Sequence, residues 1–172
     1  IVPLMESLAL PNGTAATANP KSSTGRLDIF TRVIADYAQE FDKVPEGYYG
    51  PLYAEISPRT FSILARQGSR LSQIRFRAGA PLASDALIHA LHANEALITS
   101  GEVNIDGGLA LSVDLTSFGK DGPVGFRAKR HSALVDVDKK DALDVLDFWE
   151  PIWRQGSLIL DPDQFYILAS KE

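Results

Sequence analysis

Short apolar runs, interrupted by proline and glycine, make up residues 1–79. Runs of this length between turn-forming residues are typical of β-strands, and proline suits strand starts and sheet edges. Five such runs, spaced by roughly 10 to 15 residues, predict a β-barrel or a β-sandwich. The predicted strands are IVPLMESLAL (1–10), LDIFTRVIA (27–35), GPLYAEIS (50–57), FSILARQ (61–67) and SQIRFRAG (72–79). The predicted connections are PNGTAATANPKSSTG (11–25), DYAQEFDKVPEGYY (36–49) and PRT (58–60).

The pattern changes to a helical period in residues 80–100. Ser84 can cap a helix, and Asp85 suits its first turn because a carboxylate there interacts well with the helix dipole. The apolar positions that follow recur at helical spacing and are Leu87, Ile88, Leu91 and Ala96. We expect a connecting helix here, followed by a loop at GEVNIDGG (101–108).

From residue 109 the strand pattern returns. The predicted strands are LALSVDLTSFG (109–119), VGFRAKRHSALVDV (124–137) and SLILDPDQFYILAS (157–170), with a helix around KKDALDVLDFW (139–149). The sequence of Ile167–Glu172 weakly resembles that of Ile1–Glu6, as expected for a repeated unit.

We therefore expect a mainly β protein made of two related, incomplete lobes with a connecting helix. Residues 1–79 would form the C-terminal part of a first lobe, 80–104 a helical linker and 105–172 the N-terminal part of a second lobe. The sequence begins without methionine and inside an apolar run. We therefore expect it to be an internal piece of a longer protein.

Composition narrows the functional classes. A length of 172 residues allows one good core or two small ones, and a net charge of −5 argues against a nucleic-acid partner. No apolar run reaches the ~18 residues that span a bilayer, and no signal peptide is visible. The absence of cysteine excludes disulfides, thiolate nucleophiles and cysteine zinc sites. We expect a cytoplasmic protein with no membrane partner.

A candidate anion site lies in residues 21–26. Lys21 offers a fixed charge, Ser22 and Ser23 offer hydroxyl donors, and Arg26 adds a planar fork of donors. These groups suit phosphate oxygens. The alternative is a solvated turn in which Arg26 forms an ion pair.

A tight turn, PEGYYG (45–50), follows. Its glycines permit positive φ and the close approach of a ligand. Tyr48 or Tyr49 could pack against a planar ring or simply cover the core.

Glu55 is a carboxylate within an apolar strand. Period-two alternation places it on the face shared by Pro51 and Tyr53, which could be solvent or a pocket. The pattern alone leaves both open.

Three motifs resemble those of the dCTP deaminases of the dUTPase-like superfamily, especially the long bacterial form in which two related lobes are fused. KSSTGR (21–26) matches the Arg-Ser-Ser-x-x-Arg phosphate motif, with Lys for the first Arg. RVIA (32–35) matches a water-binding β segment, and GYYGPLYAE (47–55) matches the Gly-aromatic-x-Gly turn followed by a catalytic Glu. The resemblance also covers EFDKVPEGYYGPLY (40–53), SRLSQIRFRAG (69–79), VDVDKKDALDVLDFWEP (135–151) and LDPDQFYIL (160–168).

The resemblance implies a distorted barrel of the dUTPase-like (β-clip) type and hydrolytic deamination of dCTP to dUTP and ammonia. Glu55 would act as the general base, while the carbonyls of Val33 and Ala35 orient the water. Ser22 and Arg26 would stabilise the charge and the leaving amino group. The residues assigned to nucleotide or phosphate binding are Lys21, Ser22, Ser23, Arg26, Tyr48 and Gln73.

The resemblance also implies partners and cofactors. The nucleotides would be dCTP and dUTP, Mg²⁺ would accompany the triphosphate, and no zinc would be used, because zinc deaminases carry cysteine ligands. We further expect a homo-oligomer with shared active sites.

Two alternatives to a simple deaminase stay open. dUTPases carry an Asp just before the Gly-aromatic turn, where this sequence has Pro45, so deamination is the preferred reading. Glu46, one position on, keeps a bifunctional deaminase and dUTP pyrophosphatase possible. The other alternative is a non-catalytic β module that binds a nucleotide or builds an oligomer.

The remaining patterns predict no metal site. His89 and His92 share a helix face but lack an evident third ligand, and His131 belongs to a basic surface strand. NGT (12–14) fits a turn.

Overall fold

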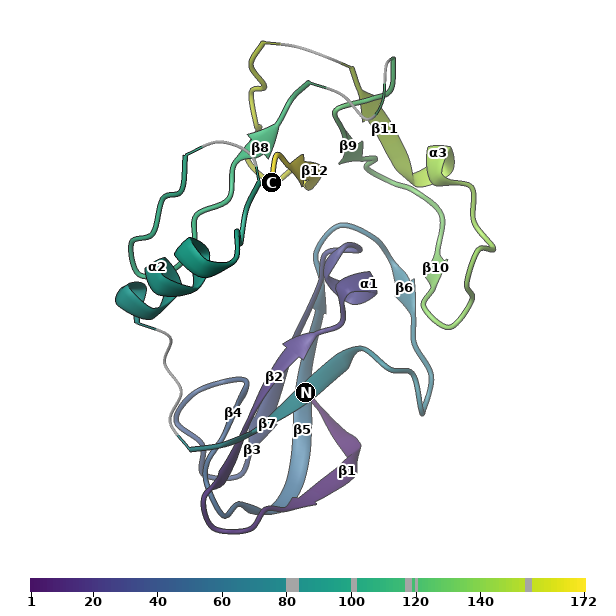
Figure 1. Cartoon of the computed structure of the whole chain (residues 1–172). Helices are drawn as coiled ribbons and strands as arrows, with labels where there is room; N and C mark the ends of the chain where they lie inside the picture. The colour runs from purple at the N-terminus through teal and green to yellow at the C-terminus, as the bar shows by residue number, and fades with distance from the viewer. Residues whose placement is uncertain (80–83, 100–101, 117–118, 120, 154–155) are drawn as a thin grey trace. The chain divides into compact units, whose positions relative to one another are not determined.

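The structure is a computed structural model that describes residues 1–79, 84–99, 102–116, 119, 121–153 and 156–172. The chain forms two compact units (Figure 1). Unit 1 comprises Ile1–Ala80 and Ala128–Trp149, and unit 2 comprises Pro81–Arg127 and Glu150–Glu172. The predicted lobe boundaries stay predictions.

The elements confirm the mainly β class. The strands are β1 (Val2–Ala9), β2 (Thr14–Pro20), β3 (Ile29–Ala35), β4 (Lys43–Val44), β5 (Tyr49–Pro58), β6 (Ile63–Leu64), β7 (Ser72–Ala78), β8 (Val113–Asp114), β9 (Gly125–Ala128), β10 (Val135–Asp136), β11 (Trp149–Ile152) and β12 (Tyr166–Ser170). The helices are α1 (Ser22–Gly25), α2 (Asp85–Asn94) and α3 (Val145–Phe148).

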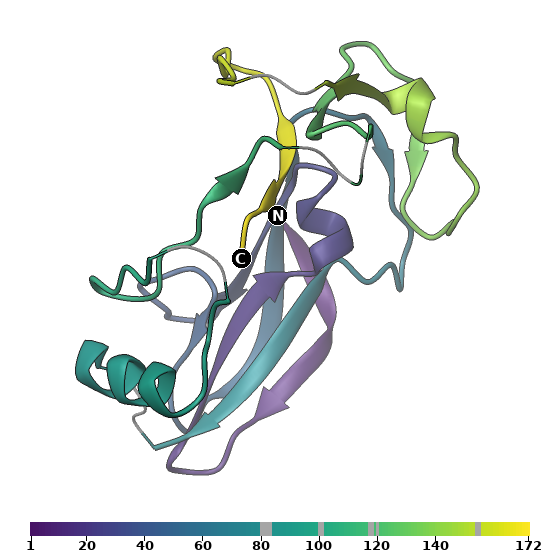
Figure 2. The ribbon, with the colours of Figure 1, turned by 45° about the horizontal axis from the view of Figure 1, so that its top comes forward.

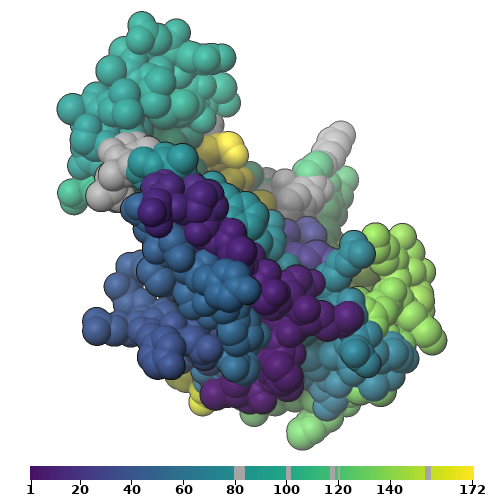
Figure 3. All heavy atoms as spheres, turned by 90° about the horizontal axis from the view of Figure 1, so that it is seen from below, coloured from purple at the N-terminus to yellow at the C-terminus, as the bar shows by residue number. Residues whose placement is uncertain are grey.

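Unit 1 is built on two three-stranded sheets. One has the order β1-β5-β3 and the other the order β4-β2-β7, and all pairs in them are antiparallel. Strands β3 and β5 of the first sheet, and β2 and β7 of the second, run side by side in both ribbon views (Figures 1 and 2). Most residues of β1 are exposed, and the strand belongs to the purple band on the surface in Figure 3. Among the described residues these sheets are open, so the expected barrel is not closed.

Buried and exposed side chains alternate along β3 and β5, and the buried ones contribute to the core of unit 1. Odd-numbered residues of β3 are buried, and even-numbered ones are partly or fully exposed. The same alternation buries Leu52 and Ala54 of β5. The core cluster contains Ala16, Ala18, Val33, Ala35, Val44, Tyr48 and Leu52.

Asp42 joins the two sheets. Its backbone N–H donates to the Val33 carbonyl (2.8 Å), and its carboxylate Oδ1 accepts from the Val33 N–H (2.8 Å). Its carbonyl accepts from the N–H of Ala18 in β2 (2.8 Å). The residue adopts φ of 62°, which Asp tolerates better than most side chains. A single residue in a loop thus satisfies backbone groups of β2 and β3.

A second cluster holds residues 128–149 against β6. Strand β10 pairs with β6 in parallel, and Phe61 contacts the rings of Phe148 and Trp149 edge-to-face at 5.9 and 5.3 Å between centroids. Beside this pair of strands, the Arg66 guanidinium donates to both carboxylate oxygens of Asp136, at 2.7 and 2.8 Å. This hydrogen-bonded ion pair lowers the pKa of Asp136 from 3.8 to about 2.

Unit 2 contains α2 and a sheet of order β11-β9-β12-β8. Ser84 caps α2, as predicted, by accepting from the Leu87 N–H at 3.3 Å. In the sheet, Arg127 forms an ion pair with Glu150. No helix in the described part of the chain is long and apolar enough to cross a membrane.

Several strand predictions were wrong. The supposed connection 11–25 contains β2, the central strand of its sheet. Its buried residues, Ala16 and Ala18, have weak strand propensity, but both are packed in the core cluster of unit 1. The strand predicted over 124–137 is two strands, because β9 pairs with β12 and β10 pairs with β6.

Other predicted elements are shorter than expected. The strand over 61–67 covers only β6, and the strand over 157–170 covers only β12. The helix around 139–149 is the four-residue α3, followed at once by β11. The ends of the 80–100 prediction lie outside the described residues.

Replacing Asp42 tests the junction between the sheets. Asp42→Ala removes the acceptor of the buried Val33 N–H, so we expect unfolding free energy to fall by about 1–3 kcal/mol. Asp42→Asn keeps an oxygen acceptor and tolerates positive φ, so its loss should be smaller. Urea unfolding of both variants measures this, and equal losses would contradict the assigned role.

The Arg66–Asp136 pair predicts a pH dependence. Because the folded-state pKa of Asp136 is about 2, below its ordinary 3.8, the pair stabilises the fold above pH 4. This contribution is lost as the pH falls toward 2. Arg66→Gln should return the pKa toward 3.8 in a carboxyl NMR titration, whereas Arg75→Gln should leave it near 2. An unchanged pKa in the Arg66 variant would refute the assignment.

Candidate functional site

The predicted phosphate turn lies between β2 and β3. The Lys21 N–H donates to the Leu71 carbonyl (2.9 Å), which fixes the turn against the start of β7. The Lys21 carbonyl in turn accepts from the N–H groups of Thr24 and Gly25, at 2.9 and 2.8 Å. The side chains of Ser22 and Ser23 are exposed on the resulting short helix α1.

The charges of this turn have no carboxylate partner among the described residues. Neither Lys21 nor Arg26 forms an ion pair there. Arg26 Nε donates to the Ser22 carbonyl at 3.3 Å, which curls the guanidinium over its own turn. The ion pair considered as the alternative is therefore not formed in the described part of the chain, and both cations are available to an anion.

Glu55 lies directly opposite Arg32 in the antiparallel pairing of β5 with β3. Both side chains are partly exposed and lie on the outer face of the sheet, while Ala54 on the other face is buried. The Arg32 guanidinium lies over the rings of Phe30 and Phe41, at 4.2 and 4.6 Å from their centroids. These cation–π contacts hold Arg32 without using the Glu55 carboxylate.

The predicted water-binding carbonyls lie on β3. The Val33 carbonyl accepts from the Asp42 N–H at 2.8 Å, and the Ala35 carbonyl accepts from the Ala38 N–H at 3.2 Å. A carbonyl oxygen has two lone pairs, so each can accept one further hydrogen bond. Binding of a water by these carbonyls stays a prediction.

Tyr48 is buried beneath its turn, at 8% exposure. Its hydroxyl donates to the Pro51 carbonyl and accepts from the Asp36 N–H at 3.0 Å. A Cβ at position 50 would lie only 2.8 Å from this hydroxyl, which explains Gly50. The group that closely approaches the turn at Gly50 is thus the Tyr48 hydroxyl. Tyr49 is exposed.

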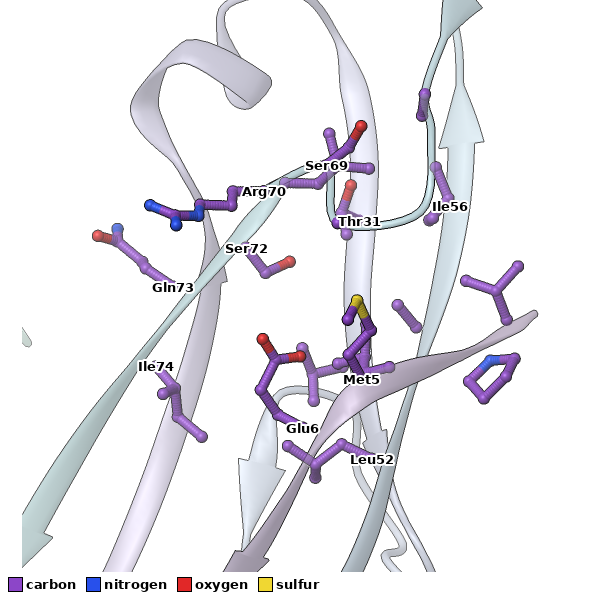
Figure 4. Close-up of a pocket in the computed structure, with 18 of the residues that line it drawn as sticks. Met5, Glu6, Thr31, Leu52, Ile56, Ser69, Arg70, Ser72, Gln73 and Ile74 are labelled. Carbon is purple, nitrogen blue, oxygen red and sulfur yellow. The ribbon is translucent and has the colours of Figure 1, made fainter. Parts of the chain in front are cut away.

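An open cavity of about 1290 Å³ lies between the two sheets of unit 1 (Figure 4). Its apolar lining includes Val33, Leu52 and Ile74. Figure 4 shows Glu6 of β1 and Ser72 of β7 beside it. The Ser72 hydroxyl oxygen is buried and has no hydrogen-bond partner among the residues that the structure describes. Such an unpaired group costs free energy unless a ligand or water satisfies it.

The structure brings only some of the predicted residues to this cavity. Lys21, Val33 and Gln73 line it. Glu55 lies on the other face of β5, because the cavity is lined by its neighbours Ala54 and Ile56. The remaining predicted residues, Ser22, Ser23, Arg26, Ala35 and Tyr48, are not among its lining.

Several residues at the cavity were not predicted from the sequence. Glu6, Thr31, Arg70 and Ser72 line it without having been singled out. Arg70 and Ser72 belong to the stretch SRLSQIRFRAG, so their segment was noted but its loop and strand contacts could not be known.

The histidines and Glu46 have other contacts. His92 Nδ1 accepts from the Leu97 N–H at 3.1 Å, which fastens the segment after α2. The carboxylate of Glu46 accepts from the Gly13 N–H in the turn between β1 and β2. In the described ranges, no three His, Cys, Asp or Glu side chains gather in a group that could hold a metal ion.

Comparison with known proteins places these features in a family. The model of the "2'-deoxycytidine 5'-triphosphate deaminase (DCD) N-terminal domain" matches residues 1–80, and that of the corresponding C-terminal domain matches residues 84–172. A search of curated proteins found no match.

A solved structure agrees with the family models. It is the crystal structure of 2'-deoxycytidine 5'-triphosphate deaminase from Agrobacterium tumefaciens, with 62% sequence identity and a TM-score of 0.91. The match covers 98% of this chain and 50% of the solved chain, so this chain spans about half the length of that protein. Two family models that together span nearly the whole sequence, and this identity, show that the chain belongs to the 2'-deoxycytidine 5'-triphosphate deaminase family, with its mainly β, dUTPase-like fold.

Proposed function

We propose that this protein, at its full length, hydrolyses dCTP to dUTP and ammonia. The observation that supports this most strongly is the 62% identity to a 2'-deoxycytidine 5'-triphosphate deaminase over 98% of the chain. The free cations of the Lys21–Arg26 turn also fit a substrate with a triphosphate group.

In the proposed reaction, Glu55 is the general base. Its carboxylate takes a proton from the water whose oxygen attacks C4 of cytosine, and then gives that proton to N3. Glu55 would then take the proton of the new C4 hydroxyl and pass it to the amino nitrogen, so that the bond from C4 to this nitrogen breaks and leaves the C4 carbonyl and ammonia. The free lone pairs of the Val33 and Ala35 carbonyls would orient the attacking water.

The turn would supply the remaining polar contacts. Ser22 and Arg26 would stabilise the developing charge and the departing amino group, while Lys21 and Ser23 hold the phosphates. Gln73, which lines the same cavity as Lys21, can donate its amide to a phosphate oxygen. Tyr48 would act by supporting the turn through its hydroxyl contacts.

The different positions of Glu55 and of the cavity residues support an active site that is shared between copies of the protein. Lys21 and Gln73 line the cavity between the sheets, whereas Glu55 lies on the outer face of its sheet. A single copy therefore does not direct Glu55 into that cavity. We propose a homo-oligomer in which one copy supplies the base and another supplies phosphate contacts.

Metal requirements follow from the available ligands. Mg²⁺ would accompany the triphosphate, bound mainly by phosphate oxygens and water; Glu6 is a carboxylate at the cavity that could contribute. Zinc is not proposed, because the chain has no cysteine to supply the ligands of the zinc deaminases.

Glu55→Gln tests the proposed base. The amide keeps the size of the side chain but cannot take a proton from water, so we expect kcat to fall by about 10²–10⁴-fold while dCTP still binds. The measurement is chromatography of dUTP, dUMP and ammonia after incubation of the full-length protein with dCTP and Mg²⁺. Glu40→Gln is the matched control, because Glu40 is exposed and pairs only with neighbouring Lys43 in the contacts described.

Product identity separates the alternatives. We expect no dUMP, because the chain has Pro45 at the position where dUTPases carry the Asp that activates water. Appearance of dUMP would favour the bifunctional enzyme. Tight dCTP binding without turnover by the unmodified protein would instead favour a non-catalytic module.

A further inference from the structure

We propose that Arg70 is a further phosphate-binding residue, which together with Lys21 gives the cavity its preference for a triphosphate. The inference rests on the proposed function, because it assigns a ligand group to the same site. Sequence motifs did not single out Arg70.

The strand register places Arg70 beside the phosphate turn. Pro20 pairs with Ser72, and the N–H of Lys21 donates to the carbonyl of Leu71 at 2.9 Å. Strand β2 ends at Pro20 and α1 begins at Ser22, so Arg70 directly precedes the residue that fixes the start of the phosphate turn. Residues 50 positions apart in sequence therefore meet at one end of the β2–β7 pair.

The side chain of Arg70 is directed where an anion could reach it. Arg70, Lys21 and Gln73 all line the cavity. Figure 4 shows the guanidinium of Arg70 and the amide of Gln73 extending in the same direction from this segment, away from the labelled Thr31 and Ile56 and toward open space. Both groups are exposed and present N–H donors, which match phosphate oxygens.

A comparison with Arg66 shows why Arg70 differs from an ordinary structural arginine. Arg66, in the same loop, is bonded to Asp136 through both terminal nitrogens and also pairs with Asp138 at 3.4 Å. Arg70 has no ion pair within the described residues. Of the two, Arg70 keeps its fork of donors available for a ligand.

The chemistry favours the outer phosphates of a nucleoside triphosphate. Lys21 supplies a compact point charge, whereas the planar guanidinium of Arg70 can donate two parallel hydrogen bonds to one phosphate. A monophosphate, with fewer charges and oxygens, would engage fewer of these donors. Arg70 would therefore favour dCTP over dCMP without touching the base.

Arg70→Gln in the full-length protein is the decisive variant. We expect KM for dCTP to rise about 10- to 100-fold, while kcat changes by less than about twofold, because a charged hydrogen-bond partner of the phosphates is lost. Arg70→Lys should recover part of the loss. Arg75→Gln is the matched control, since Arg75 is exposed on β7 but does not line the cavity.

Binding of inorganic tripolyphosphate, measured by calorimetry, separates this inference from the proposed activity. Weaker binding in Arg70→Gln but not in Arg75→Gln supports the inference, even if the unmodified protein shows no deamination. Unchanged tripolyphosphate binding and unchanged KM in an active enzyme would overturn it while leaving the activity intact. Equal weakening of dCMP and tripolyphosphate binding would also overturn it, because a general structural effect would then explain both.

Discussion

The arrangement of unit 1 depends on hydrogen bonding by Asp42. This residue satisfies the N–H and carbonyl of Val33 and the N–H of Ala18, and so links one strand from each sheet. Buried backbone groups need partners, and a loop can supply three contacts here because Asp tolerates a left-handed backbone. The same contacts fix the edge of β3 at which the Val33 and Ala35 carbonyls would accept hydrogen bonds from a water.

Once the edge of β3 is fixed, side-chain alternation divides its sheet into two functional faces. The inner face lines the cavity that Lys21 and Gln73 reach. The outer face carries Glu55 opposite Arg32, whose charge is held by two aromatic rings rather than by the carboxylate. Within one copy Glu55 therefore does not reach the cavity that Lys21 lines, which is consistent with the proposal that neighbouring copies complete each other's sites.

The distribution of carboxylates distinguishes structural from ligand-binding cations. Arg66 is neutralised by Asp136 and Asp138, and this pairing helps to hold residues 128–149 within unit 1. Lys21, Arg26 and Arg70 have no such partners among the described residues. In a chain of net charge −5, cations left unpaired around a single turn form a local basic site.

The sequence by itself determined the family and the positions of the candidate motifs, because these depend on residue type and short spacing. Period-two alternation also placed Glu55 on the face opposite Leu52 and Ala54 correctly. It could not reveal β2, whose small buried alanines carry little strand preference and gain their place from packing. Only the tertiary structure decided that Lys21 bonds to the neighbour of Arg70, that the Glu46 carboxylate accepts from the Gly13 N–H and that residues 124–137 divide between two sheets. These features arise from contacts between residues far apart in sequence, which no local pattern encodes.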